Sequence, residues 1–108
     1  MDETINKIIK WGNEKGIDNP AKQFQKLAEE MLEAHEAYLE MVITEDWTGE
    51  YEEHLKEELG DIGVVWILLC NMLEIDPREV LEIAHNKNKD RKGKTIKGNF
   101  IKEEDLDE

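Results

Sequence analysis

The fold of this chain is constrained most by how few residues in it interrupt a helix. Only two prolines and seven glycines occur in 108 residues, and alternating β-branched residues are scarce. Both prolines follow a capping residue, in Asn19-Pro20 and Asp76-Pro77, so they mark helix starts. We predict an all-α chain with four helices, over about residues 2–13, 20–42, 51–73 and 77–90.

The second and third predicted helices each carry a narrow apolar stripe. The first apolar seam consists of Phe24, Ala28, Met31, Tyr38 and Val42. The second apolar seam consists of Leu55, Leu59, Ile62, Trp66, Leu69 and Leu73. Spacings of three, four and seven residues keep each seam on one face of its helix, which suits packing along another helix.

Part of the third helix predicts an assembly of several chains. Residues 62–69 are apolar on nearly every side, and a helix of this kind must be buried all round. Few other helices are present to cover it, so we expect a homodimer or a higher homo-oligomer. In the fourth helix we expect Val80, Leu81, Ile83 and Ala84 to face inward.

The end of the chain has no helical period. Residues 95–101 are compatible with a small hairpin, and the acidic residues 102–108 are expected to fray. We therefore predict one domain over residues 1–108, with a helical core to about residue 90 and a short, irregular, basic tail over residues 91–108.

Charge and composition exclude several classes of protein. Fourteen Lys and Arg face twenty-seven Asp and Glu, a net charge of −13, which argues against binding a nucleic acid polymer. The single cysteine, Cys70, excludes a disulfide framework and a cysteine-based zinc site. The longest apolar stretch, residues 62–70, is far below the roughly 18 residues of a membrane span, and we expect no secretory signal. We expect a cytoplasmic protein without membrane contact.

The residues that point to chemistry are carboxylates in two short motifs. The second helix contains Glu29-Glu30-Met31-Leu32-Glu33, and the third contains Glu58-Leu59-Gly60-Asp61. Residues three apart lie on the same side of a helix, so two carboxylate pairs flank the apolar seams. If the seams pack antiparallel, the pairs converge. Crowded carboxylates need protons or cations between them, and an all-oxygen set favours Mg²⁺ or Mn²⁺.

An alternative is that the motifs arise by chance in an acidic chain. Glu29, Glu33, Glu36 and Glu40 also form a stripe that fits a solvated helix face. Gly60 and Gly63 favour the metal interpretation, because glycine costs about 1 kcal/mol inside a helix and usually permits close approach of a backbone or ligand.

The arrangement of these motifs resembles a known family. Residues 26–33, a spacer of 24 residues and residues 58–61 match the E-E-x-x-E and E-x-x-D pattern of the MazG-like all-α nucleotide pyrophosphohydrolases. The likeness continues downstream in residues 86–94 and upstream in Trp11, Gln23 and Lys26. It implies a four-helix-bundle-like core assembled as a homodimer or homotetramer.

The resemblance also implies an activity. Members hydrolyse nucleoside triphosphates between the α and β phosphates with Mg²⁺, releasing a monophosphate and pyrophosphate. The metal ligands carried over are Glu30, Glu33, Glu58 and Asp61. Glu33 or Glu29 would take the proton from the attacking water, and a role in clearing or balancing nucleotide pools follows.

A basic segment follows the fourth helix. Seven of the fourteen cations lie between residues 87 and 102, and only Asp90 opposes them. We predict that Lys87, Asn88, Arg91 and Lys94 bind phosphate, with Asn88 and Arg91 chosen because they match the family pattern. The alternatives are that the cations complement the helix dipole or balance an acidic surface.

Four residues are candidates for a base pocket: Trp11, Gln23, Trp47 and His54. Trp11 would stack on a base or pack against the second helix, and Trp47 would cover a base or anchor its loop. His54 would reach the substrate or a metal ligand, or lie at the surface.

Two other functions stay open at this point. The chain would be a non-catalytic helical interaction module if it kept the fold without turnover. A di-metal oxidase needs two E-x-x-H pairs, and the chain offers one, Glu82 with His85.

Overall fold

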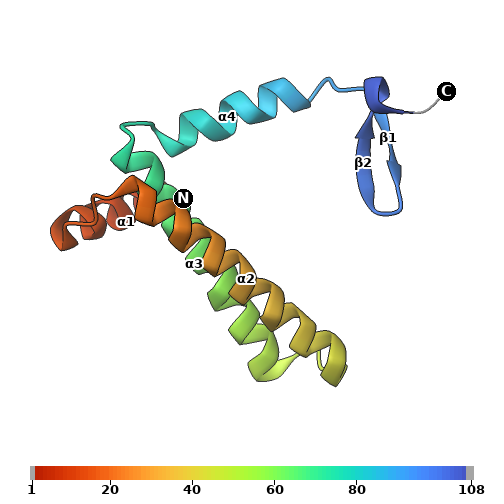
Figure 1. The fold of residues 1–108 in the computed structure, drawn as a ribbon, viewed down its shortest axis with the longest axis horizontal. Helices are drawn as coiled ribbons and strands as arrows, with labels where there is room; N and C mark the ends of the chain where they lie inside the picture. Colours follow the sequence, from red (N-terminus) through yellow and green to blue (C-terminus); the bar gives the residue numbers. More distant parts are fainter. Residues whose placement is uncertain (1, 107–108) are drawn as a thin grey trace. The chain divides into compact units, whose positions relative to one another are not determined.

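The computed structural model describes residues 2–106 and confirms a chain built mainly of helices (Figure 1). The elements are α1 (Asp2–Lys15), α2 (Pro20–Thr44), α3 (Gly49–Met72), α4 (Pro77–Asn88), β1 (Gly93–Ile96), β2 (Asn99–Lys102) and the 3-10 turn η1 (Glu103–Asp105). Each predicted helix is present, with ends that differ from the prediction by about two residues. The turn η1 lies within the residues expected to fray, and residues 107–108 lie outside the described residues.

The chain divides into two compact units between Ile75 and Asp76, where α3 gives way to α4. The first unit holds α1, α2 and α3, and the second holds α4 and the hairpin. The boundary between the units falls before the fourth helix, and the single domain expected over residues 1–108 stays a prediction.

In the first unit, α2 and α3 lie side by side and run antiparallel (Figure 1). Asn19 caps α2, because its Oδ1 accepts a hydrogen bond from the Lys22 backbone N–H at 3.1 Å, and Pro20 follows at the first helical position. Residues 45–48 connect the two helices, and so short a connection returns the chain directly alongside α2.

The face that α2 buries is not the first apolar seam. Its buried residues are Gln23, Glu30, Ala34, Ala37 and Met41. Phe24 and Met31 of the seam are 55% and 56% exposed, and Leu59 of the second seam is also exposed, so the antiparallel packing of the two seams, which the sequence left as a condition, does not occur within one chain. Periodicity shows which residues share a face, but it does not show which face meets which neighbour. Here α3 packs against the two alanines, whose small side chains admit it closely.

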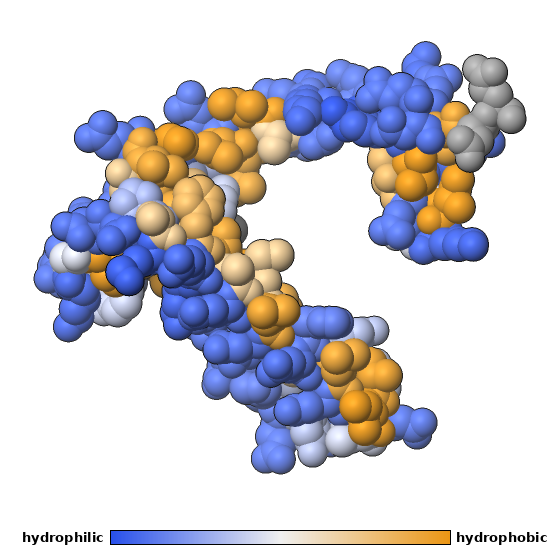
Figure 2. Space-filling view, viewed as in Figure 1, coloured by the Kyte–Doolittle hydropathy of each residue, from blue (hydrophilic) through white to orange (hydrophobic). Residues whose placement is uncertain are grey.

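Apolar surface therefore stays open in a single chain. Figure 2 shows it as orange patches on the α2–α3 pair and on the hairpin. Within residues 2–106, no helix combines the length and the apolar character needed to cross a bilayer.

The helix α1 packs on α3. Gly12 lies against Leu68, so closely that a Cβ atom at position 12 would overlap the leucine side chain. Nearby, Asn71 Nδ2 donates a hydrogen bond to Asn13 Oδ1 at 3.0 Å. These contacts anchor α1 to the apolar second half of α3, where Leu68 and its neighbours are buried.

In the second unit, the predicted hairpin is confirmed and spans residues 93–102. Its turn residues Lys97 and Gly98 both have positive φ, 50° and 83°, the conformation of the two-residue turns that suit the twist of paired strands. Leu81 and Ile83 of α4 are exposed, so the prediction that they face inward is wrong for a single chain. An apolar residue on a short amphipathic helix needs a covering partner, which its periodicity alone does not supply.

Candidate functional site

Three of the predicted ligands meet across the α2–α3 interface. Glu30 and Glu33 come from α2 and Glu58 from α3, and each offers a carboxylate oxygen within 4.8 Å of those of the other two. We call these three residues the acidic cluster. Glu30 and Glu33 stand one helical turn apart, and the antiparallel packing brings Glu58 to them. The convergence expected of the two carboxylate pairs is therefore present for three of the four residues, although the seams do not produce it.

The acidic cluster contains buried oxygens that the protein leaves unpartnered. Glu30 is only 5% exposed, and Glu58 is half-buried. The Oε2 atoms of both are buried without a hydrogen-bond partner. Such an oxygen is costly unless a donor or a cation satisfies it. A set of carboxylate oxygens is the chemistry that Mg²⁺ and Mn²⁺ prefer, so these residues fit a divalent ion.

The charges in the acidic cluster act on one another. The pKa of Glu33 is raised, first by the negative charge of Glu30, then by burial and by the charge of Glu58. The pKa of Lys26 is raised, mainly because its ammonium is hydrogen-bonded to the Glu30 carboxylate. Lys26 Nζ lies 2.9 Å from Glu30 Oε1. The Lys-x-x-x-Glu spacing in the sequence already places these two residues one helical turn apart, a signal that the family likeness of Lys26 does not use.

Asp61 and Glu29 stand outside the acidic cluster. Asp61 lies one turn after Glu58 on α3 and is exposed, and its assignment as a fourth ligand stays a prediction. Glu29 is exposed on α2, where its charge acts on Lys26. A Cβ atom at Gly60 or Gly63 would meet no atom of the described chain within 4 Å apart from the adjacent residues and the local helix backbone, so the close approach that these glycines would permit does not occur within one chain.

Of the predicted base-pocket residues, His54 lies nearest to the acidic cluster. Its Nε2 is 3.9 Å from Glu58 Oε1, an ion pair when the imidazole is protonated. His54 also lines a hollow of about 260 Å³ with Glu40, Glu50 and Tyr51, at the end of the helix pair where α2 gives way to α3.

The other three candidates lie in separate places. Gln23 is buried, and its Nε2 donates to the Val65 carbonyl at 3.2 Å, which ties α2 to α3. The ring of Trp47 packs against Tyr38 with the centroids 6.4 Å apart, which anchors the loop. Trp11 is half-exposed and lines an apolar hollow of about 330 Å³ with Thr4, Lys7, Ile8 and Val64.

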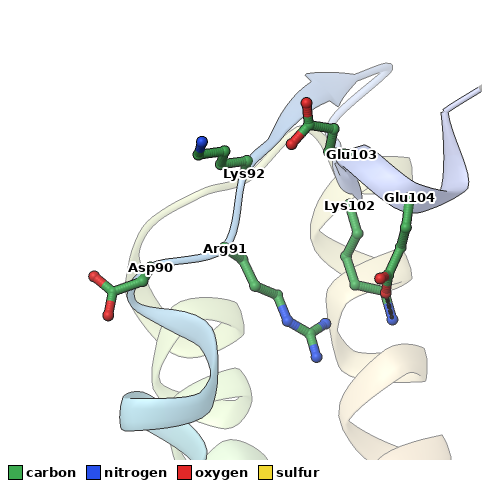
Figure 3. Close-up of a pocket in the computed structure, with 6 residues that line it drawn as sticks. All are labelled: Asp90, Arg91, Lys92, Lys102, Glu103 and Glu104. Carbon is green, nitrogen blue, oxygen red and sulfur yellow. Dashed lines mark ion pairs between the residues drawn. The ribbon is translucent and has the colours of Figure 1, made fainter.

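The predicted phosphate-binding residues belong to the second unit. Lys87 and Lys94 are exposed, and Asn88 Nδ2 donates to the Ala84 carbonyl at 2.8 Å. Arg91 is half-buried in a hollow of about 520 Å³ that is also lined by Asp90, Lys92, Lys102, Glu103 and Glu104. Figure 3 shows its guanidinium extending toward Lys102 and Glu104, while Asp90 and Lys92 point away from it.

Comparison with known proteins adds one match. The sequence model of one family, described as the MazG nucleotide pyrophosphohydrolase domain, matches residues 19–96. No curated protein matches the chain, and no solved structure does. The match covers both carboxylate motifs, all three residues of the acidic cluster and the four predicted phosphate-binding residues. The chain belongs to the MazG nucleotide pyrophosphohydrolase family.

Proposed function

We propose that this protein is a Mg²⁺-dependent nucleoside triphosphate pyrophosphohydrolase, which converts a (d)NTP to a (d)NMP and pyrophosphate and so clears or balances nucleotide pools. The observation that carries the proposal is the pair of buried, unpartnered Oε2 atoms of Glu30 and Glu58 inside the acidic cluster. Family membership supplies the reaction class.

In this proposal Glu30, Glu33 and Glu58 hold Mg²⁺, and Asp61 joins them as a fourth ligand; Mn²⁺ has the same preference for oxygen. A divalent ion in such a site neutralises charge on the phosphates and makes water more acidic. The carboxylates themselves bind and orient the ion.

Glu33 is the proposed proton acceptor, with Glu29 as the alternative. Water attacks the α-phosphorus, its proton passes to the Glu33 carboxylate, and the bond from the α-phosphorus to the bridging oxygen breaks as pyrophosphate leaves. The place of Glu33 in the acidic cluster supports this role, because its carboxylate would lie beside the water that a divalent ion makes more acidic.

Other parts of the substrate have proposed partners too. Lys87, Asn88, Arg91 and Lys94 are proposed to bind phosphate oxygens, as Arg does in bidentate contacts and Lys as a point charge. Trp11, Gln23, Trp47 and His54 remain the candidates for the base side. Among them, His54 has the strongest support, because it lies 3.9 Å from a proposed metal ligand.

We further propose that the protein acts as a homodimer or homotetramer in the cytoplasm, where free nucleotides occur. The support for assembly is the exposure of apolar residues on α2 and α3: Phe24, Met31, Tyr38 and Leu59. Open apolar surface of this kind is typical of an interaction site.

The test is product analysis with a panel of ribo- and deoxyribonucleoside triphosphates and Mg²⁺. We expect equal amounts of monophosphate and pyrophosphate from at least one nucleotide. Release of orthophosphate and a diphosphate would contradict cleavage between the α and β phosphates. If no nucleotide is cleaved and the protein binds no Mg²⁺, the chain is the non-catalytic helical module.

A further inference from the structure

The ion pair between Lys26 and Glu30 joins an accessible ammonium to an inaccessible carboxylate. The Lys26 side chain is 51% exposed and that of Glu30 is 6% exposed, with 2.9 Å between Nζ and Oε1. Most Lys–Glu pairs one turn apart on a helix are exposed at both ends and contribute little. Lys56 with Glu52, 3.2 Å apart on α3, has the same spacing with both side chains far more open than Glu30.

The burial of Glu30 changes what the lysine does. A buried carboxylate must have a counter-charge, and removing its partner leaves a charge that the protein interior stabilises poorly. Among the described residues, Lys26 is the cation paired with Glu30, and the other neighbours in the acidic cluster are negative. Lys26 therefore supplies to the acidic cluster part of the positive charge that a divalent ion would bring.

The two oxygens of Glu30 divide between these cations. Oε1 is paired with Lys26, whereas Oε2 is buried without a partner. A divalent ion that binds Oε2 would be attracted less strongly, because the charge of the Glu30 carboxylate is already partly neutralised. The Lys26 ammonium, which is paired with the same carboxylate, would also repel the ion.

We propose that Lys26 is the built-in counter-cation of the acidic cluster, and that it weakens and thereby sets the affinity of the cluster for divalent ions. This inference rests on the proposed metal site. It assigns Lys26 as an affinity-determining residue that acts through Glu30. The ammonium of Lys26 explains how three carboxylates can stay close together before an ion binds. When a divalent ion binds, it takes over from Lys26 much of the neutralisation of the negative charge.

The test is a calorimetric titration of the whole protein with Mn²⁺ in the absence of nucleotide. K26Q removes the charge, K26R keeps it, and K56Q removes the matched lysine that pairs with Glu52 outside the acidic cluster. We expect K26Q to bind Mn²⁺ about tenfold more tightly than the wild type. K26R and K56Q should stay within about twofold of the wild type, since neither changes the charge beside Glu30.

Thermal unfolding gives a second readout. Without metal, K26Q should melt below the wild type, and Mn²⁺ should raise its melting temperature by more than it raises that of the wild type. If K26Q does not fold without metal, recovery of its helical circular dichroism on addition of Mn²⁺ supports the proposal, and a failure to recover contradicts it.

The inference and the proposed metal site fail in different ways. Wild-type protein that binds Mn²⁺ no more weakly than K26Q overturns the role of Lys26 and leaves the metal site standing. Wild-type, K26R and K26Q proteins that all bind no Mn²⁺ overturn both.

Discussion

Glu30 and Glu58 bring carboxylate oxygens within 4.8 Å of each other across the α2–α3 interface, and each has a buried Oε2 atom without a hydrogen-bond partner. Like charges so close together oppose folding, and buried oxygens without donors add to that cost. The α2–α3 interface is therefore destabilised at these carboxylates, which is also where a cation fits. Strain of this kind, confined to one site, is typical of functional residues.

Replacing Glu33 with Gln should stabilise the metal-free protein at neutral pH, because one negative charge beside Glu30 and Glu58 is lost. The pKa of Glu33 is raised in the folded state, so its protonation favours folding at pH values below the ordinary glutamate range. That contribution is lost as pH rises through the raised pKa. The melting temperature of E33Q should exceed that of the wild type by more as pH increases across this interval.

The control is E36Q, which removes an exposed glutamate one turn further along α2 and outside the acidic cluster. Thermal melts from pH 4 to pH 8 without metal compare the three proteins. An E33Q variant that is less stable than the wild type at neutral pH would contradict the proposed repulsion of Glu33 by Glu30 and Glu58.

Replacing Gln23 with Leu should lower the free energy of unfolding by about 1–2 kcal/mol, because the Val65 carbonyl loses the buried hydrogen bond that the Gln23 amide donates in addition to the helical one. Urea titration measures the change, and Q25L, an exposed glutamine on the same helix, serves as the control. Unchanged stability together with altered preference among nucleotides would instead support Gln23 in the base pocket.

Replacing Gly12 with Ala should lower the free energy of unfolding by up to about 2 kcal/mol, because the overlap of the added methyl group with the buried Leu68 side chain outweighs the helix propensity that alanine gains. G60A is the matched control, since a Cβ there meets no atom within 4 Å and alanine favours helix by up to about 1 kcal/mol. Equal effects of both substitutions on urea unfolding would show that α1 does not pack as described.

Replacing Met31 with Glu should shift the protein toward the monomer, because a charge enters the exposed apolar face proposed for assembly. Sedimentation velocity measures the shift. I43E changes an even more exposed apolar residue of α2 that lies off the first apolar seam, and it should leave the assembly intact. A wild-type protein that sediments as a monomer would refute the proposed oligomer.

The sequence predicted the helices well because their signals are local. Asn19-Pro20 and Asp76-Pro77 start α2 and α4 as expected, and both caps are made by the expected side chains. The hairpin followed from the short run around Gly98, whose positive φ the turn requires. Local rules do not specify packing, however. Phe24 and Met31 share a face, but nothing in their spacing shows whether α3 or another chain covers it.

The part of the candidate site that depends on local helical spacing could be predicted from the sequence, and the part that depends on packing could not. Glu30 and Glu33 are joined by helical spacing alone, and antiparallel packing then brings Glu58 to them. The exposed position of Asp61 and the burial of Glu30 depend on how α2 and α3 are rotated against each other. Such a rotation is set by side-chain volumes, here by Ala34 and Ala37, which sequence periodicity does not reveal.

The most direct test of the central claim is the rate of Mg²⁺-dependent pyrophosphate release by wild-type, E58Q and E57Q proteins from the nucleotide that the wild type prefers. Glu58 contributes to the acidic cluster, whereas its neighbour Glu57 is exposed and does not. If the acidic cluster is the metal site, the rate of pyrophosphate release should fall by about 100-fold or more in E58Q and by less than about twofold in E57Q. An E58Q variant that releases pyrophosphate as fast as the wild type would contradict it.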